Sequence, residues 1–270
     1  MLKKDVDAMN ITDSRIDGGK AFDWGRTSSD YARFRDIYPP EFYRKIISLG
    51  LCVDGQRVLD VGTGTGVLPR NLYNFGARWT GVDISAEQIE QAKRLSDGKN
   101  IVYEVSSAED IRFPDNSFDV ITSCQCFWYF KHEFTSRLFS NLLKPDGRFV
   151  VLSMDWLPFE DKTAGASEAL VLKYSPDWSG AGETLHELEI PNCYSEYFDI
   201  EYKEAFPLTV HFTREGWNGR MKSCRGIGAS LSEDEIRAWE AEHMKLLNEI
   251  APPEFDVAHY ATVTVMRVKK

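Results

Sequence analysis

Short apolar runs alternate with longer amphipathic stretches along the chain from residue 57 to residue 152. The apolar runs predict five buried strands, at 57–61, 78–83, 101–104, 118–123 and 149–152. Apolar positions at helical spacing predict helices between them, at 66–75, 85–95 and 132–143. Strands that are nearly all apolar and alternate with helices are typical of a parallel sheet covered on both faces.

The pattern changes on either side of this region. Before it, a polar arm of about 20 residues leads to predicted helices at 27–36 and 40–49. A Pro-Asp-Gly turn is predicted within 143–148, just before the fifth strand. After residue 155 the remaining predicted elements are a helix at 163–174, a strand at 197–212, a helix at 232–250 and a strand at 260–268. The sheet therefore resumes after an interruption, which indicates a cap over its carboxyl edge rather than an independent domain.

Composition narrows the class of protein. The chain has 270 residues, 43% of them hydrophobic, and a formal net charge of −10, which argues against a general nucleic-acid binder. Its five cysteines are scattered and include no Cys-x-x-Cys pair, so we expect reduced thiols in a cytoplasmic protein. The first residues lack the apolar core of a signal peptide, and no run of about 18 apolar residues predicts a membrane span. No metal site is expected.

The most informative stretch is VLDVGTGTGVLPRNL, residues 58–72, which predicts a strand, a glycine loop and the first turn of a helix. This arrangement is a site for a nucleotide-like ligand at the carboxyl end of a parallel strand. Val67 stands where a dinucleotide-binding loop has its third glycine, and the acidic Asp60 precedes the loop. A carboxylate there favours a ligand with an ammonium or sulfonium group over an anionic pyrophosphate.

Further polar residues follow the next strands. Asp83 ends the second strand about 20 residues after the loop, where a carboxylate can accept hydrogen bonds from both ribose hydroxyls. The sequence Ser107-Ala108-Glu109-Asp110 follows the third strand and is well placed to border an adenine.

Four motifs in register resemble those of class I S-adenosylmethionine-dependent methyltransferases: VLDVGTGTG, GVDIS, SSAEDIRFPDNSFDVI and LKPDGRFVV. They span residues 57–152 in that family's order and spacing. CQCFWYF at 124–130 is similar to a motif of the type 11, trans-aconitate-methyltransferase-like branch, but Trp128 stands where that branch has histidine. Base catalysis from that position is therefore in doubt, and we assign no catalytic base.

The resemblance implies an S-adenosyl-L-methionine cofactor and a Rossmann-like α/β fold. This fold is a doubly wound, seven-stranded, mostly parallel sheet with a helical cap insertion. The implied parts are N-terminal arm and lid helices at 1–50, a cofactor-binding core at 51–154, the cap at 155–195, and C-terminal strands at 196–270 with a helical insertion at 213–250. The implied cofactor-binding residues are Tyr31, Arg35, Asp60, Gly62, Thr63, Gly64, Gly66, Asp83, Ile84, Ala108, Glu109, Cys124 and Gln125.

By this resemblance the glycine loop approaches the methionine moiety, Asp60 lies near its ammonium, and Asp83 holds the ribose. Ile84 packs on the adenine and Glu109, with Ala108, meets its edge. Cys124 and Gln125 border the sulfonium. Tyr31 and Arg35, four residues apart on one helical face, are the candidates for the methionine carboxylate.

Structural alternatives stay open for several of these residues. Asp60 and Asp83 could cap neighbouring amides, and Ile84 and Ala108 could simply pack. Tyr31 could belong to the core.

Downstream aromatic residues could line an apolar acceptor pocket or form the cap's own core. Arg220 and Arg225 could bind an acceptor carboxylate. The predicted function is in-line methyl transfer to the oxygen, nitrogen or carboxyl group of a small molecule, by a monomer or homodimer with no membrane or nucleic-acid partner. The alternatives are a methyltransferase acting on RNA or protein, and a non-catalytic cofactor-binding protein.

Overall fold

The computed structural model describes residues 12–14 and 16–269, which divide into two compact units. The first, here called the sheet unit, comprises Tyr38–Asp155, Leu185–Leu208 and the described residues from His259 onward. The second, here called the helical unit, comprises the described residues up to Ile37, Trp156–Thr184 and Thr209–Ala258. The division of the chain given above runs in sequence order and stays a prediction.

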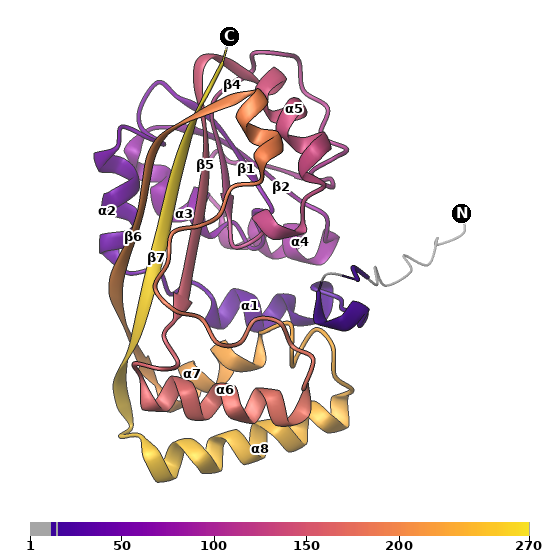
Figure 1. The fold of residues 1–270 in the computed structure, drawn as a ribbon, viewed down its shortest axis with the longest axis vertical. Helices are drawn as coiled ribbons and strands as arrows, with labels where there is room; N and C mark the ends of the chain where they lie inside the picture. The colour runs from indigo at the N-terminus through magenta and orange to yellow at the C-terminus, as the bar shows by residue number, and fades with distance from the viewer. Residues whose placement is uncertain (1–11, 15, 270) are drawn as a thin grey trace. The chain divides into compact units, whose positions relative to one another are not determined.

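Seven strands form one sheet in the order β3-β2-β1-β4-β5-β7-β6, shown in Figure 1. Their bounds are β1 Arg57–Val61, β2 Arg78–Asp83, β3 Val102–Val105, β4 Phe118–Cys124, β5 Leu143–Trp156, β6 Phe198–Thr213 and β7 Glu254–Val268. Strands β1 to β5 pair in parallel. Backbone bonds from Lys269 to Tyr197 and from Arg214 to Pro253 run in opposite order along β6 and β7, so these two strands are antiparallel. The predicted seven-stranded, mostly parallel α/β sheet is confirmed.

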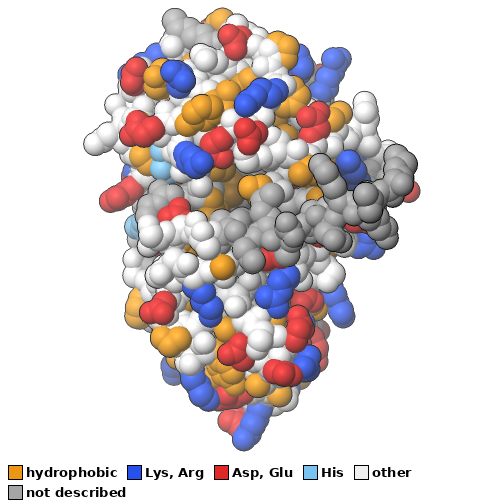
Figure 2. Space-filling model, turned by 90° about the vertical axis from the view of Figure 1, so that its right-hand side faces the viewer, with side chains coloured by type: hydrophobic (Ala, Val, Ile, Leu, Met, Phe, Trp, Pro, Cys, Tyr) orange, Lys and Arg blue, Asp and Glu red, His pale blue; other side chains and the backbone are white. Residues whose placement is uncertain are grey.

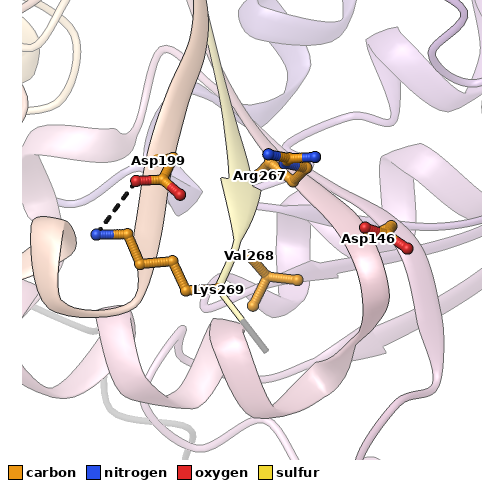
Figure 3. Close-up of a pocket in the computed structure, with 5 residues that line it drawn as sticks. All are labelled: Asp146, Asp199, Arg267, Val268 and Lys269. Atoms are coloured by element: carbon orange, nitrogen blue, oxygen red, sulfur yellow. Dashed lines mark ion pairs between the residues drawn. The ribbon is translucent and has the colours of Figure 1, made fainter.

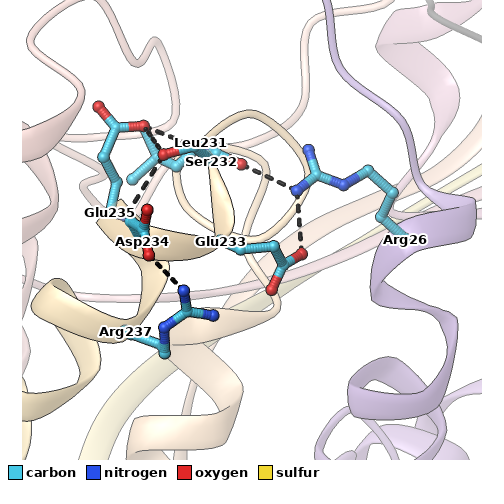
Figure 4. A network of polar contacts seen from close by, with 7 residues as sticks. All are labelled: Arg26, Leu231, Ser232, Glu233, Asp234, Glu235 and Arg237. Atoms are coloured by element: carbon cyan, nitrogen blue, oxygen red, sulfur yellow. Dashed lines mark hydrogen bonds and ion pairs between the residues drawn. The ribbon is translucent and has the colours of Figure 1, made fainter.

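The helices are α1 Ser28–Phe34, α2 Pro40–Ser48, α3 Val67–Leu72, α4 Ala86–Leu95, α5 His132–Leu142, α6 Lys162–Tyr174, α7 Arg214–Lys222 and α8 Glu233–Ile250. Helix α4 begins at the predicted N-cap, because the Ser85 hydroxyl accepts a hydrogen bond from the Gln88 amide at 3.2 Å. Helix α8 begins with a reciprocal capping box between Ser232 and Glu235, drawn in Figure 4.

Two predicted strands are longer in the structure. Strand β5 begins at Leu143 rather than 149, and the predicted Pro-Asp-Gly turn lies inside it as a bulge. The register passes directly from Phe118 opposite Leu143 to Val120 opposite Arg148, so the residues between are extruded. Strand β7 begins at Glu254 rather than 260: residues 254–257 alternate exposed polar and buried apolar side chains as a strand does, but the buried His259 breaks the pattern between them and the predicted strand.

Each unit has its own aromatic core. In the sheet unit, Phe139 and Phe149 are buried, with ring centroids 5.0 Å apart. In the helical unit, Trp156 packs against Trp178 at 6.1 Å and against Trp217 at 5.8 Å, and all three indoles are buried. These tryptophans therefore form the unit's own core, which was one of the two predicted readings. Among the described residues, no helix is both long enough and apolar enough to cross a membrane.

Candidate functional site

The strand order places the candidate site at the carboxyl ends of β1, β2 and β4. The order reverses between β1 and its neighbour β4, and open α/β sheets bind ligands in the crevice at such a reversal. Val61 at the end of β1 pairs with Val82 and with Ser123, so the segments that follow these strands meet here.

The loop after β1 needs glycine at all three predicted positions. Gly62, Gly64 and Gly66 have φ angles of 69°, 55° and 75°, in the left-handed region. A Cβ on Gly62 would lie 2.5 Å from the Cys126 sulfur, and one on Gly66 would lie 2.9 Å from Cζ of Tyr103. Packing inside the protein therefore already excludes side chains at Gly62 and Gly66, and the close approach of a ligand to the loop stays a prediction.

Asp60 is a buried carboxylate at the root of this loop, with 2% of its surface exposed. It accepts hydrogen bonds from the hydroxyls of Thr63 and Thr122, both at 2.7 Å. Burial raises the pKa of Asp60 to about 6, although the two hydroxyl donors oppose the rise. Its hydrogen bonds go to hydroxyls and not to a backbone amide, so the amide-capping alternative does not describe it. Its role near an ammonium stays a prediction.

Asp83 ties the loop to the end of β2. One carboxylate oxygen accepts from the Gly64 amide at 2.8 Å, and the other accepts from the Ser85 amide at 2.9 Å. Burial raises the pKa of the half-buried Asp83. The Ile84 amide also interacts with this carboxylate, so the amide-capping alternative describes Asp83, and its binding of ribose hydroxyls stays a prediction.

The residues that follow β2 and β3 make contacts within the protein, and these contacts favour a structural role over cofactor binding. Ala108 packs against the core of the sheet unit, while Ile84 is half-buried beside Asp83. The Glu109 carboxylate accepts from the Lys131 amide at 2.9 Å, just before α5 begins. The predicted contacts of these residues with an adenine stay predictions.

The end of β4 holds a conformationally strained residue. Gln125 has φ = 61°, unusual outside glycine, and its side-chain amide donates to the Met154 carbonyl. Next to it, the Cys124 thiol donates to the Tyr38 hydroxyl at 3.3 Å. Strain of this kind costs about 1 kcal/mol or more and clusters at functional sites. Tyr38 lies far from Cys124 in sequence, and no local pattern predicts this contact.

Thr65, in the middle of the loop, was not among the predicted site residues. Its side chain is 1% exposed, and its hydroxyl has no hydrogen-bond partner among the described residues. A buried polar group without a partner is rare in native proteins and indicates a missing ligand atom or water. The loop therefore fits a ligand with polar groups that can reach Thr65 and Asp83.

Tyr31 and Arg35 belong to the helical unit. As their spacing predicts, they lie together: the Arg35 guanidinium stacks over the Tyr31 ring at 4.7 Å and donates to its hydroxyl at 3.4 Å. Their contact with a methionine carboxylate stays a prediction.

The two downstream arginines have structural partners within the helical unit. Arg225 is buried and forms an ion pair with Asp17 at 2.6 Å. The Arg220 guanidinium lies 4.9 Å from the Trp156 ring and donates to the Cys224 sulfur at 3.2 Å. Arg225 therefore pairs with a carboxylate of its own unit, which favours a structural role, and its binding of an acceptor carboxylate stays a prediction.

A separate open hollow of about 540 Å³ lies where the parallel strands begin, away from the glycine loop. Asp146, Asp199 and Arg267 line it with Lys269, which pairs with Asp199 at 3.2 Å (Figure 3). None of these charged residues is among the cofactor-binding residues predicted from the sequence.

A seven-stranded sheet in this order, with a three-glycine loop after β1 and an aspartate ending β2, defines the class I S-adenosylmethionine-dependent methyltransferase fold. Comparison with known proteins agrees. Residues 59–151, about a third of the chain, match the family described as "Methyltransferase domain".

Individual relatives are distant. A candidate methyltransferase of Dictyostelium discoideum is 26% identical over 192 residues, which cover 71% of this chain and 68% of that protein. The ubiquinone biosynthesis O-methyltransferase of Bradyrhizobium diazoefficiens is 33% identical over 150 residues, which cover 53% of this chain and 56% of that enzyme. The chain thus spans about two thirds of the first relative and little more than half of the second. A solved candidate type II methyltransferase of Anaeromyxobacter dehalogenans has a TM-score of 0.55 at 19% identity, covering 87% of this chain and 97% of that one.

Proposed function

We propose that this protein binds S-adenosylmethionine at the glycine loop and transfers its methyl group to a small-molecule acceptor. The observation that carries the proposal is that the glycine loop contains a buried Thr65 hydroxyl without a partner among the described residues and donates its Gly64 amide to the Asp83 carboxylate. The loop and Asp83 follow or end the neighbouring parallel strands β1 and β2, next to the reversal of strand order where a nucleoside-like ligand is expected.

In this proposal, three residues of the sheet unit interact with different parts of the cofactor. Asp83 holds the ribose hydroxyls, while the Thr65 hydroxyl meets a polar atom of the methionine part. Asp60 places negative charge beneath a cationic ligand. When bound, the cofactor supplies a methyl group already activated on a sulfonium, so the protein mainly aligns the acceptor in line and excludes water.

Three observations support a small-molecule acceptor. The chain carries a net charge of −10. Figure 2 shows acidic and basic side chains interspersed over one face, which offers no continuous basic surface among its described residues. The Bradyrhizobium relative is named for ubiquinone biosynthesis, which is small-molecule chemistry.

Calorimetric titration with S-adenosylmethionine and S-adenosylhomocysteine tests the cofactor assignment. We expect Asp83→Asn to weaken both by about a hundredfold, because two hydrogen bonds to a charged group are lost or weakened. Asp119→Asn is the matched control, since this carboxylate also accepts from a backbone amide, that of Arg57 at 2.8 Å, and pairs with Lys144, but lies near the start of β4, at the other end of the strand from the site. Unchanged affinity in Asp83→Asn, or equal losses in both variants, contradicts the assignment.

The second experiment concerns turnover. Release of S-adenosylhomocysteine is measured while carboxylate, phenol and amine acceptors are screened separately. Turnover with any of these supports a small-molecule methyltransferase. Tight cofactor binding with turnover only on RNA or protein contradicts the proposed acceptor class, and binding with no turnover on any acceptor points to a binding protein.

A further inference from the structure

Tyr103, on the edge strand β3, lies directly against the glycine loop. A Cβ built on Gly66 would meet the Tyr103 hydroxyl oxygen in a severe clash and would lie 2.9 Å from Cζ of the same ring. A Cβ on Gly81 of β2 would lie 2.8 Å from Cδ1 of Tyr103. One tyrosine ring therefore fills the space that two glycines leave open.

Packing against α4 and a hydrogen bond fix the Tyr103 ring in this position. Tyr103 is buried and packs against Ile89 and Ala92 of α4. Its hydroxyl is 2.9 Å from the Ser96 hydroxyl, at the C-cap of the same helix. Burial raises the pKa of Tyr103 to about 12, so the phenol is neutral at physiological pH.

A short chain of hydrogen bonds connects Gly66 to the predicted ribose-binding carboxylate. The Gly66 amide donates to the Thr63 carbonyl at 2.9 Å, and the Thr63 amide donates to the Val82 carbonyl at 2.9 Å. The next residue in the loop, Gly64, donates its amide to Asp83 at 2.8 Å. A shift of Gly66 therefore moves backbone atoms that fix the Asp83 carboxylate.

We propose that Tyr103 is a positioning residue for the cofactor site, with its hydroxyl, anchored by Ser96, setting the position of Gly66 and thereby of Gly64 and Asp83. The inference rests on the proposed function, since it assumes that this loop binds the cofactor. Tyr103 touches the loop and needs no contact with the ligand.

Tyr103→Phe removes the hydroxyl and keeps the ring. We expect S-adenosylhomocysteine to bind about three- to tenfold more weakly, the range that corresponds to loss of one hydrogen bond. Tyr194→Phe is the matched control: Tyr194 is also buried in the sheet unit, and its hydroxyl lies 3.1 Å from the Thr135 hydroxyl of α5 rather than against the glycine loop. It should cost comparable thermal stability and change affinity less than twofold. Ser96→Ala, which frees the Tyr103 hydroxyl but leaves it in place, should weaken binding in the same direction by a smaller factor.

A double-mutant cycle separates positioning from general loosening of the fold. In the wild-type background, Gly66→Ala forces a methyl group against the Tyr103 hydroxyl, whereas in Tyr103→Phe that oxygen is gone. We therefore expect Gly66→Ala to lose affinity by a larger factor in the wild type than in Tyr103→Phe. Equal factors in both backgrounds, or wild-type affinity in Tyr103→Phe, overturn the inference while the proposed function stands. A wild-type protein that binds neither S-adenosylmethionine nor S-adenosylhomocysteine overturns both, before any variant is compared.

Discussion

Replacing Asp60 by asparagine should stabilise the fold near neutral pH. The Asp60 carboxylate is almost completely buried and accepts hydrogen bonds from two threonine hydroxyls. Asparagine has nearly the same shape and can keep both contacts, since its carbonyl accepts from one hydroxyl and its amide donates to the other. The substitution therefore removes a buried charge with little change in packing.

The magnitude follows from the pKa of Asp60. Burial raises that pKa from 3.8 to about 6, so the folded protein holds this proton more tightly than the unfolded chain does. The neutral carboxyl contributes its full stabilisation below about pH 3.8, and this contribution is lost as the pH rises to about 6. At about 1.4 kcal/mol for each pH unit, the ionised carboxylate costs about 3 kcal/mol near pH 7.

Urea unfolding of the wild type and Asp60→Asn at several pH values between 4 and 7.5 measures this cost. Between pH 4 and pH 7, the free energy of unfolding of the wild type should fall by about 2.5 kcal/mol relative to that of the variant, because part of the effect lies below pH 4. All other titrating groups are common to both proteins and cancel in the difference. If the difference in free energy of unfolding between the wild type and Asp60→Asn does not change with pH, the pKa of Asp60 is not raised by burial.

The same variant should lose affinity for a cationic ligand. If Asp60 provides negative charge for an ammonium, Asp60→Asn binds S-adenosylmethionine and S-adenosylhomocysteine more weakly at pH 7.5, although its fold is more stable. Stability and affinity moving in opposite directions is the result expected of a charge retained for binding. A gain in stability with unchanged affinity for both ligands removes Asp60 from the site.

Three further predictions concern the helical unit. Burial lowers the pKa of His243 to about 3, so stability should fall by about 1.4 kcal/mol per pH unit as the pH drops from about 6.5, and urea unfolding of His243→Gln should lack this slope. Arg225→Met should cost about 3–5 kcal/mol in the same assay, because it leaves the Asp17 carboxylate buried without its cation, and a loss below about 1 kcal/mol contradicts this. Ser232→Ala removes the N-cap of α8 shown in Figure 4 and should cost about 1 kcal/mol in thermal unfolding, whereas an unchanged Tm means that the cap adds nothing.

Local sequence patterns predict β1 and β2 to the residue, because strand alternation and glycine preference act between neighbours in the chain. They also bring together Tyr31 and Arg35, four residues apart. Helix 66–75 is predicted too long, since Gly66 with φ = 75° lies outside α3 and a 3-10 turn follows Leu72. The bulge in β5 could not be predicted, because Pro-Asp-Gly indicates a local turn and does not show that Leu143 before it pairs with Phe118 of β4.

Contacts between distant residues could not be predicted in the same way. The Tyr38–Cys124 hydrogen bond joins residues 86 apart, and the Asp17–Arg225 ion pair joins residues 208 apart. Such pairs depend on which strands and helices become neighbours, and neither periodicity nor residue type contains that information. This is why the sequence marked Arg225 as a candidate for substrate recognition and gave no sign of its ion pair with Asp17.

The distribution of unfavourable features supports the site independently of any motif. The sheet unit buries a carboxylate at Asp60, leaves the Thr65 hydroxyl without a partner among the described residues and holds Gln125 in a left-handed conformation. Each feature costs about 1 kcal/mol or more, and all three follow or end two adjacent strands, β1 and β4. Buried polar atoms without a partner among the described residues also occur elsewhere, such as the indole nitrogen of Trp239 in the helical unit, and Asp17 there has φ = 48°. The three features named above differ in that they follow or end β1 and β4, the strands on either side of the reversal in strand order, and they therefore support the proposal that a ligand binds there.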